Sequence, residues 1–205
     1  MASADPAAPL PPERIVLRDL LVRRWTLDDA PALHQAVTAS YANLHRWVGW
    51  ASRPSTLAAQ EDFLDTMARR WDAGRTWSYA VLDLAETRLL GSAGIYDRTG
   101  YCAGDIAYWV HTDHTGRGIA FTCAAVLTGV ALALPGADRV EIHCDQANVA
   151  SAAVARKLGY RLDGIHDDVR DAPAKTGQRM VWTMTATAYP GSPAERQART
   201  ASWTP

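Results

Sequence analysis

The chain lacks three features that would each indicate a class of protein: an excess of charge of one sign, a long apolar run and a rich set of cysteines. Among its 205 residues, 21 Lys and Arg side chains stand against 22 Asp and Glu side chains, for a formal net charge of −1. A dedicated nucleic-acid-binding domain usually carries a clear basic excess. We therefore expect no nucleic-acid partner.

The longest apolar run covers residues 119–134 and is interrupted by two threonines and a glycine. A transmembrane helix needs about 20 consecutive, predominantly apolar residues, so this run is too short to cross a bilayer comfortably. We interpret it as a buried helix and expect no association with a membrane.

Cysteine is scarce and dispersed. Cys102, Cys123 and Cys144 stand 21 residues apart, with no Cys-x-x-Cys pair. An odd and dispersed set favours reduced, buried thiols over disulfides or a zinc site. The N-terminus also lacks the basic-then-apolar layout of a secretory signal. These observations predict a cytoplasmic protein without a bound metal.

The chain contains no internal repeat and no low-complexity linker, which indicates a single domain over residues 14–187. The proline-containing ends, residues 1–13 and 188–205, are expected to be flexible tails. Within the domain, strand-like and helix-like patterns alternate in the order β-α-α-β-β-β-α-β-α-β-β. This order predicts an α/β sheet that is mainly antiparallel early and has parallel crossovers later.

Residues 105–120 form the most informative stretch. An apolar strand, residues 106–110, leads through a short loop with Gly116 and Gly118 into the apolar helix. Such a loop can direct several backbone N–H groups at one point, and the helix dipole adds partial positive charge there. The layout predicts a site for a phosphate group.

Three interpretations of this loop compete. A Walker loop requires a lysine directly after the second glycine, and Ile119 follows Gly118 here. A dinucleotide-binding fingerprint requires a small residue at position 121, which is Phe121. The third interpretation is an ordinary strand-to-helix turn, which the loop by itself leaves open.

The loop and two later motifs together resemble the GNAT acetyltransferase superfamily. The motifs are Thr115-Gly-Arg-Gly118-Ile-Ala120, Asn148-Val-Ala-Ser151 and Lys157-Leu-Gly159-Tyr160. The first follows the superfamily's acyl-CoA loop, Gln/Arg-x-x-Gly-x-Gly/Ala, except that Thr115 replaces Gln or Arg. Two further stretches resemble the RimJ/RimL branch: Leu44-His-Arg-Trp47-Val-Gly-Trp50, and the run from Glu141 to Gly164. The resemblance covers about residues 14–187.

The resemblance implies the GNAT fold, with a central, mixed and mostly antiparallel sheet of about six or seven strands flanked by about four helices. It also implies acetyl-CoA as the cosubstrate. Asn148 has an alternative role, because asparagine is a favoured helix cap. The implied donor-binding residues are Val110, His111, Thr115, Gly116, Arg117, Gly118, Ile119, Ala120, Phe121, Asn148 and Ser151.

The resemblance implies that Ser151 is the acid beside the CoA sulfur, although a serine in a first helical turn can be merely structural. The RimL-like pattern has a glutamate nineteen residues later, where this chain has Arg170. Asp105 is therefore an alternative base, because it begins the strand that leads to the thioester. Glu141 and His143 alternate with apolar residues, which places them together on one strand face.

The acceptor is expected to be a primary amine, first of all the α-amine of a peptide N-terminus. An α-amine is neutral at pH 7 roughly several hundred times more often than a lysine, a difference of about 3.5 kcal/mol. Alternatives are an acetyltransferase for a small molecule (an antibiotic, amino acid or polyamine) and a noncatalytic CoA-binding module. Related enzymes are often dimeric, so a homodimer is a further expectation. Candidate acceptor-site residues are Trp47, Trp50, Trp109, Asp167 and Asp168.

Overall fold

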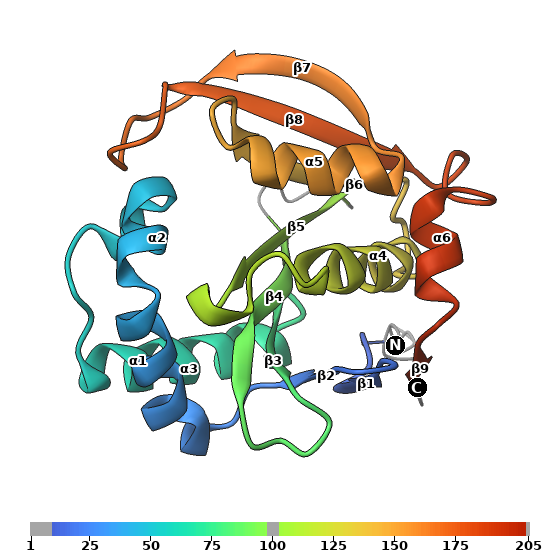
Figure 1. Ribbon diagram of the computed structural model, residues 1–205. Helices are drawn as coiled ribbons and strands as arrows, with labels where there is room; N and C mark the ends of the chain where they lie inside the picture. Colours follow the sequence, from blue (N-terminus) through green and yellow to red (C-terminus); the bar gives the residue numbers. More distant parts are fainter. Residues whose placement is uncertain (1–9, 98–102, 204–205) are drawn as a thin grey trace, which may run out of the picture.

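The computed structural model describes residues 10–97 and 103–203 (Figure 1). Nine strands of this part form one open sheet in the order β7-β8-β6-β5-β4-β3-β2-β1-β9. The strands are β1 (Arg14–Val16), β2 (Leu21–Arg24), β3 (Thr76–Leu82), β4 (Leu89–Asp97), β5 (Ala103–Val110), β6 (Arg139–Asp145), β7 (Arg161–Asp167), β8 (Gln178–Thr185) and β9 (Ser202–Trp203).

Six α-helices accompany the sheet in the same described ranges. They are α1 (Ala30–Ala39), α2 (Tyr41–Trp47), α3 (Leu57–Asp72), α4 (Ile119–Leu132), α5 (Val149–Leu158) and α6 (Pro193–Ala198). Three short 3-10 turns complete the elements: η1 (Leu27–Asp29), η2 (Gly49–Ala51) and η3 (Thr112–His114).

One pair of neighbouring strands in the described sheet is parallel, and it is short. β5 and β6 pair over three residues, from Ala103↔Arg139 to Asp105↔Glu141. β5 then runs on to Val110 paired with β4 alone, while β6 pairs with β8 up to Asp145. The two central strands therefore separate beyond Asp105, which leaves one edge of β5 unpaired in the middle of the sheet.

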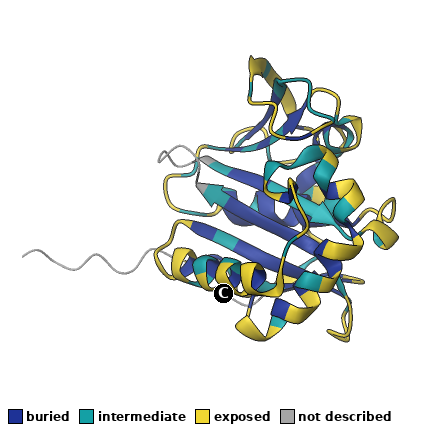
Figure 2. Cartoon of the chain, turned by 90° about the vertical axis from the view of Figure 1, so that its left-hand side faces the viewer, coloured by how far each residue is buried: buried dark blue, intermediate teal, exposed yellow. Residues whose placement is uncertain are grey.

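Helices cover both faces of the sheet. The larger core lies under α4, α5 and α6, and a second core lies under α1, α2 and α3 (Figure 1). Figure 2 shows the central strands mostly buried and the outer helix surfaces exposed. Nine of the fourteen residues of α4 are buried, which confirms the prediction of a buried helix for this apolar segment. No described helix is long and apolar enough to span a membrane.

Local sequence signals explain where several elements begin and end. Thr56 caps α3 by accepting a hydrogen bond from the Ala59 N–H at 3.2 Å, as a threonine before an apolar-periodic segment predicts. Gly159 ends α5 with φ of 86°, a left-handed conformation that glycine adopts without strain. A Cβ at Gly159 would also lie 2.9 Å from Pro193, so the position requires glycine on two counts.

Three details differ from the sequence prediction. The described sheet has more strands than six or seven, because the first strand of the predicted order is divided into β1 and β2, and because β9 adds a short edge. There are six helices rather than about four. The parallel crossovers expected late in the chain reduce to the single β5–β6 pair, since β7, β8 and β6 pair antiparallel.

The C-terminal segment also differs from the flexible tail expected from residue 188. Ser192 caps α6 by accepting from the Glu195 N–H, and Pro193 occupies the first helical position. Ala194 and Ala198 are buried in the larger core, and β9 pairs with β1. The prolines that suggested a flexible tail include a helix-start signal, since proline is favoured at that position. The predicted N-terminal tail lies mostly outside the described residues.

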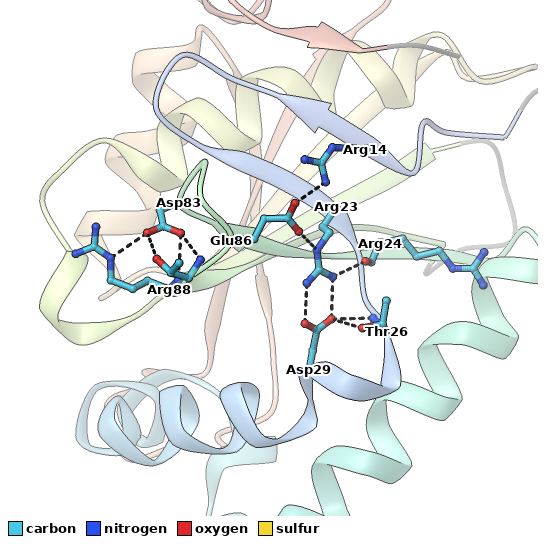
Figure 3. Close-up of polar contacts among 9 residues, drawn as sticks. Arg14, Arg23, Arg24, Thr26, Asp29, Asp83, Glu86 and Arg88 are labelled. Carbon is cyan, nitrogen blue, oxygen red and sulfur yellow. Dashed lines mark hydrogen bonds and ion pairs between the residues drawn. The ribbon is translucent and has the colours of Figure 1, made fainter.

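A partly buried ion-pair network joins β2 to the elements around it (Figure 3). Arg23 makes two hydrogen bonds to the Asp29 carboxylate, at 2.7 and 2.8 Å, and a third to Glu86 at 2.9 Å. Asp29 also accepts from the backbone N–H of Thr26. The network fixes the entry to α1 against the β3–β4 hairpin and lies away from the cavity described next.

Candidate active site

A cavity of about 620 Å³ lies beside the half of β5 that β6 leaves unpaired. Its walls come from α2, β5, the loop before α4, the first turn of α4, and α5. This volume falls within the range of small-molecule and cofactor sites, which is roughly 300–1,000 Å³. Nine of the predicted donor-site residues line it: Val110, Thr115, Gly116, Gly118, Ile119, Ala120, Phe121, Asn148 and Ser151.

The glycine loop has the backbone that an anion site needs. Gly116 and Gly118 have φ of 75° and 79°, and Gly118 is the N-cap of α4. No atom lies within 4 Å of a Cβ added at either glycine, so both positions open onto free space. The first N–H groups of a helix have no intrahelical partner and carry partial positive charge. The loop therefore fits a phosphate group approaching along the helix axis.

The polar side chains of this loop do not all face the cavity. The Thr115 hydroxyl donates to the Thr112 carbonyl at 3.0 Å, so at the first motif position it stabilises the loop itself. Arg117 lines a neighbouring cavity of about 540 Å³ on the other side of the loop. His114 lines both cavities, and burial, followed by the charge of Arg117, lowers its pKa.

The backbone of β5 has free hydrogen-bonding groups at the cavity. The His111 N–H donates to the Leu90 carbonyl on β4 at 2.8 Å. Since N–H groups alternate between the two sides of a strand, those of Tyr108 and Val110 point to the unpaired edge. The His111 carbonyl accepts from the His114 N–H. Of the two donor-binding residues implied at this end of β5, Val110 has a free backbone N–H, whereas the backbone of His111 is engaged within the protein.

Ser151 lines the cavity beside a tyrosine that the sequence patterns did not single out. Its Oγ is 3.0 Å from the Tyr108 hydroxyl, and Tyr108 also lines the cavity. Burial raises the pKa of Tyr108, so its hydroxyl keeps its proton at neutral pH. The pKa of Cys144 is raised as well, because burial outweighs the hydrogen bonds with Ser151 and Trp182 that lower it. Ser151 thus joins β5, β6 and α5 through its hydroxyl.

The sequence signal for Tyr108 was present, because alternation along residues 106–110 places it on the same face as Ile106 and Val110.

Asn148 performs the alternative role considered for it, which is that of a helix cap. Its Oδ1 accepts from the Ser151 N–H at 3.1 Å and caps α5, while the residue still lines the cavity. Tyr160, the last residue of the third motif, is buried in the core, and its hydroxyl lies 2.6 Å from that of Thr128.

Two of the three tryptophans predicted for the acceptor site come together. Trp47 on α2 and Trp109 on β5 both line the cavity, whereas Trp50 does not and is 57% exposed.

The loop after β7 contacts the end of α2 and the residues that follow it. The Ala174 N–H donates to the Arg46 carbonyl at 3.0 Å, and the Asp171 carboxylate lies so near Gly49 that a Cβ there would meet it at 2.3 Å.

The acidic residues of that loop have partners within the protein. Asp167 accepts from Gln178 at 2.7 Å, and Asp168 lies 3.7 Å from Arg179 and 3.9 Å from Lys175. The structure does not place Asp167 or Asp168 among the residues that line the cavity. Arg170, at the position where the RimL-like pattern has a glutamate, donates to the Thr176 carbonyl at 2.6 Å and holds the loop.

Asp105 lies on the opposite face of β5 from Tyr108 and is 4% exposed. It pairs across the short parallel ladder with Glu141, and His143 follows two residues later. The His143 Nε2 lies 2.8 Å from Glu141, and its Nδ1 lies 4.0 Å from the Asp105 carboxylate. The predicted shared face of Glu141 and His143 is therefore present, with Asp105 beside it. Across residues 10–97 and 103–203, no group of three or more His, Cys, Asp or Glu is arranged to hold a metal ion.

Comparison with known proteins identifies the family. A model described as an acetyltransferase (GNAT) domain matches residues 19–161, well over half of the chain. No curated protein sequence matches.

Solved structures with the same fold include several acetyltransferases. RimL, a ribosomal L7/L12 α-N-protein acetyltransferase in complex with CoA, is 21% identical with a TM-score of 0.78, over 86% of this chain and 99% of its own. RimJ of Mycobacterium smegmatis with a CoA disulfide is 21% identical with a TM-score of 0.77, and the match covers 95% of this chain and 100% of RimJ. The microcin C7 self-immunity acetyltransferase MccE, with acetyl-CoA and AMP, is 14% identical with a TM-score of 0.72, and the match covers 82% of this chain and 93% of MccE. The chain belongs to the GNAT acetyltransferase family.

Proposed function

We propose that the chain transfers the acetyl group of acetyl-CoA to a primary amine, and first of all to the α-amine of a peptide or protein N-terminus. The observation that carries the proposal is a single cavity that both the glycine loop and the Ser151–Tyr108 pair line. The RimL and MccE structures contain CoA or acetyl-CoA, which supports a CoA thioester as donor.

The residues present fit this donor. The N–H groups around Gly116 to Phe121 would hold the pyrophosphate, and the free backbone groups of Tyr108 and Val110 would bind the pantetheine arm as a neighbouring strand does. The thioester would then lie near Ser151. Acetyl-CoA supplies an activated acyl group, and the chain supplies its position and the protons.

Transfer requires a neutral amine and a proton for the departing thiolate. We assign the proton for the thiolate to the Ser151 hydroxyl, which Tyr108 contacts at 3.0 Å. Asp105 lies on the opposite face of β5, where an acceptor would approach, and its carboxylate would hold the acceptor's ammonium group and help to remove its proton. Trp47 and Trp109 would form the apolar wall of the acceptor site.

A peptide N-terminus is favoured because an α-amine is neutral at pH 7 roughly several hundred times more often than a lysine. The position of the RimL-like glutamate is occupied by Arg170, which is bound to its own loop, so no strong carboxylate base is added there. RimL acts on a protein α-amine according to its name, which supports the same acceptor class.

Two other functions remain as alternatives. MccE, a self-immunity enzyme with the same fold, favours a small-molecule acceptor such as an antibiotic, amino acid or polyamine. The absence of a carboxylate at Arg170 favours a noncatalytic CoA-binding module. A cytoplasmic location, the absence of a bound metal and a homodimer stay predictions from the sequence.

The test uses the full chain with acetyl-CoA and a panel of amines, and it measures release of the CoA thiol. The panel contains peptides with free N-termini, the same peptides with a blocked N-terminus and one lysine, and small amines. We expect release with the free N-terminal peptides and little with the blocked ones. Preference for small amines would favour the second function. CoA binding without release on any amine would favour the noncatalytic module and overturn the proposal.

A further inference from the structure

A polar cluster lies on the face of the central strands opposite Ser151, and the function proposed above leaves part of it unexplained. The cluster consists of Asp105 on β5 and of Arg139, Glu141 and His143 on β6. The Arg139 Nε is 2.9 Å from the Glu141 carboxylate, and the other oxygen of that carboxylate is 2.8 Å from the His143 Nε2. The side chains of Asp105, His143 and Glu141 are 5%, 12% and 16% exposed.

The hydrogen bonds determine which nitrogen of His143 carries its proton. Burial alone would raise the pKa of Glu141, but hydrogen bonds from Arg139 and His143 lower it, so Glu141 is a carboxylate that only accepts. The His143 Nε2 therefore donates. In the neutral ring the lone pair is then on Nδ1, which is buried and has no hydrogen-bond partner among the residues that the structure describes. Nδ1 is an available proton acceptor.

The position of His143 in the sheet places this acceptor where the two central strands separate. His143 stands two residues beyond the last β5–β6 pair, where the two strands have begun to separate. Its neighbour Cys144 points to the other face and interacts with Ser151 there. Since successive side chains of a strand point to opposite faces, the imidazole is on the side of the gap opposite the proposed acid. The Asp105 carboxylate lies 4.0 Å from its Nδ1.

We propose that His143 is the final acceptor of the proton that the acceptor amine must lose, and that Glu141 is its positioning residue. The inference rests on the proposed acetyl transfer. The ammonium group, held by Asp105, gives one proton to the His143 Nδ1. The nitrogen then attacks the thioester carbon, the carbon–sulfur bond breaks, and the thiolate takes a proton from Ser151. The nitrogen's second proton replaces the one that Ser151 gave, and the imidazolium releases its own to solvent.

The charged groups that face His143 are carboxylates and paired cations. An ordinary imidazole binds a proton more tightly than an ordinary aspartate, by about 2.6 pH units. In the proposed step the Glu141 carboxylate, 2.8 Å from the His143 Nε2, stabilises the imidazolium. On the described parts of β6, β7 and β8, three cations lie on the same face. Arg139 is paired with Glu141, Arg179 lies 3.7 Å from Asp168, and Arg161 lies 3.1 Å from Asp163. Each has an acidic partner, which limits its effect on the ring.

The experiment measures kcat/KM between pH 5 and 9 for the full chain, with saturating acetyl-CoA and an N-terminal peptide. We expect an acidic limb in the parent protein, produced by protonation of His143. His143→Gln should lower the rate by about 100-fold, the lower end of the range for a general base, and should abolish that limb. Glu141→Gln should keep the limb and move it to lower pH by about one unit, since a neutral amide no longer favours the imidazolium. Asp105→Asn should lower the rate and keep the limb.

His166→Gln is the matched control, because His166 is an exposed histidine of the edge strand β7, and its profile should equal the parent's. An acidic limb that persists in His143→Gln, or that is lost in Asp105→Asn alone, overturns the proposal. If His143→Gln does not fold, as thermal unfolding will show, the Glu141→Gln shift decides, and an unshifted limb overturns it. Failure of the parent protein to acetylate any amine is a different result, which counts against the proposed function itself.

Discussion

The backbone and the side chain of Ser151 have separate partners. Its backbone N–H is bound by the Asn148 cap, while its Oγ contacts Tyr108 in the cavity. The helix cap therefore does not depend on the hydroxyl. A substitution that removes only the Oγ separates chemistry from folding.

We expect Ser151→Ala to lower turnover by about 100-fold, the lower end of the range for the loss of a positioned proton donor. The affinity for CoA should change by less than about two-fold, since the proposed phosphate site consists of backbone N–H groups of the loop before α4. Turnover is followed by thiol release and affinity by calorimetry. Tyr108→Phe, which keeps the serine, should have the smaller effect. Unchanged turnover in Ser151→Ala would remove the hydroxyl from the mechanism.

Asp29 is the residue on which a stability prediction can be made most directly. Burial would raise its pKa, but hydrogen bonds from Arg23 and Thr26 outweigh burial and lower it (Figure 3). A carboxyl with a lowered pKa in the folded state contributes stability above its unfolded pKa of about 3.9. That contribution is lost as the pH falls through the lower, folded value.

Asp29→Asn should therefore reduce the free energy of unfolding at pH 7 by about 1–2 kcal/mol, since Arg23 keeps Glu86 as a partner. The difference from the parent protein should narrow below pH 4. Urea denaturation at pH 7 and pH 3 measures both values. Asp65→Asn is the control, because Asp65 forms an exposed pair with Arg69 on α3 and should contribute less than about 0.5 kcal/mol. An equal difference at both pH values would contradict the assignment.

At the scale of elements, the glycine loop and the separation of β5 from β6 form the proposed donor site. Two glycines in left-handed conformation bring the chain from β5 into α4 without side chains at the cavity mouth. Backbone strain and site blockage can be separated, because Gly74 has a similar conformation, with φ of 66°, between α3 and β3.

Gly118→Ala and Gly74→Ala should each cost about 1–2 kcal/mol of stability, the cost of a left-handed non-glycine residue. Only Gly118→Ala should weaken CoA binding, by about 10-fold, since its Cβ would project where a phosphate has to approach the helix N-terminus. Thermal unfolding and titration with CoA measure the two effects. Equal CoA affinity in both variants would mean that the phosphate lies elsewhere.

At the scale of the whole molecule, the C-terminal segment completes the fold instead of trailing from it. Tyr189 packs so closely on Gly129 of α4 that a Cβ there would meet its hydroxyl at 2.6 Å. Ala194 and Ala198 of α6 are also buried, and β9 pairs with β1 at the edge of the sheet.

A chain that ends at Thr187 should be less stable by about 3 kcal/mol, the order expected for exposing one tyrosine and two alanines. Urea denaturation of the shortened and full chains measures the difference. A flexible tail would predict equal midpoints, so equal midpoints would contradict the packing of α6. A chain that ends at Ser202 is the control and should keep most of the stability, because only the end of β9 is removed.

Much of the fold could be predicted because local chemistry determines it. The apolar segment from Ile119 forms a buried helix, Thr56 begins α3, and the glycine motif leads into α4. The family resemblance rested on the same local signals, together with the Asn148–Ser151 spacing. The apolar and polar patterns of strands and helices need no knowledge of distant residues, since each follows from a period of two or 3.6 residues.

The sequence by itself thus determined the family and the turn that leads from β5 into α4, and it predicted the donor site and the role of Ser151, which stay proposals. Tertiary structure decided what lies opposite what. It placed Tyr108 at 3.0 Å from Ser151, and it placed His143 between two carboxylates. It also gave the backbone of His111 and the carboxylate of Asp168 partners within the protein. These outcomes depend on strand register and on where β5 and β6 separate. Both arise from contacts between segments far apart in the chain, which local sequence patterns do not encode.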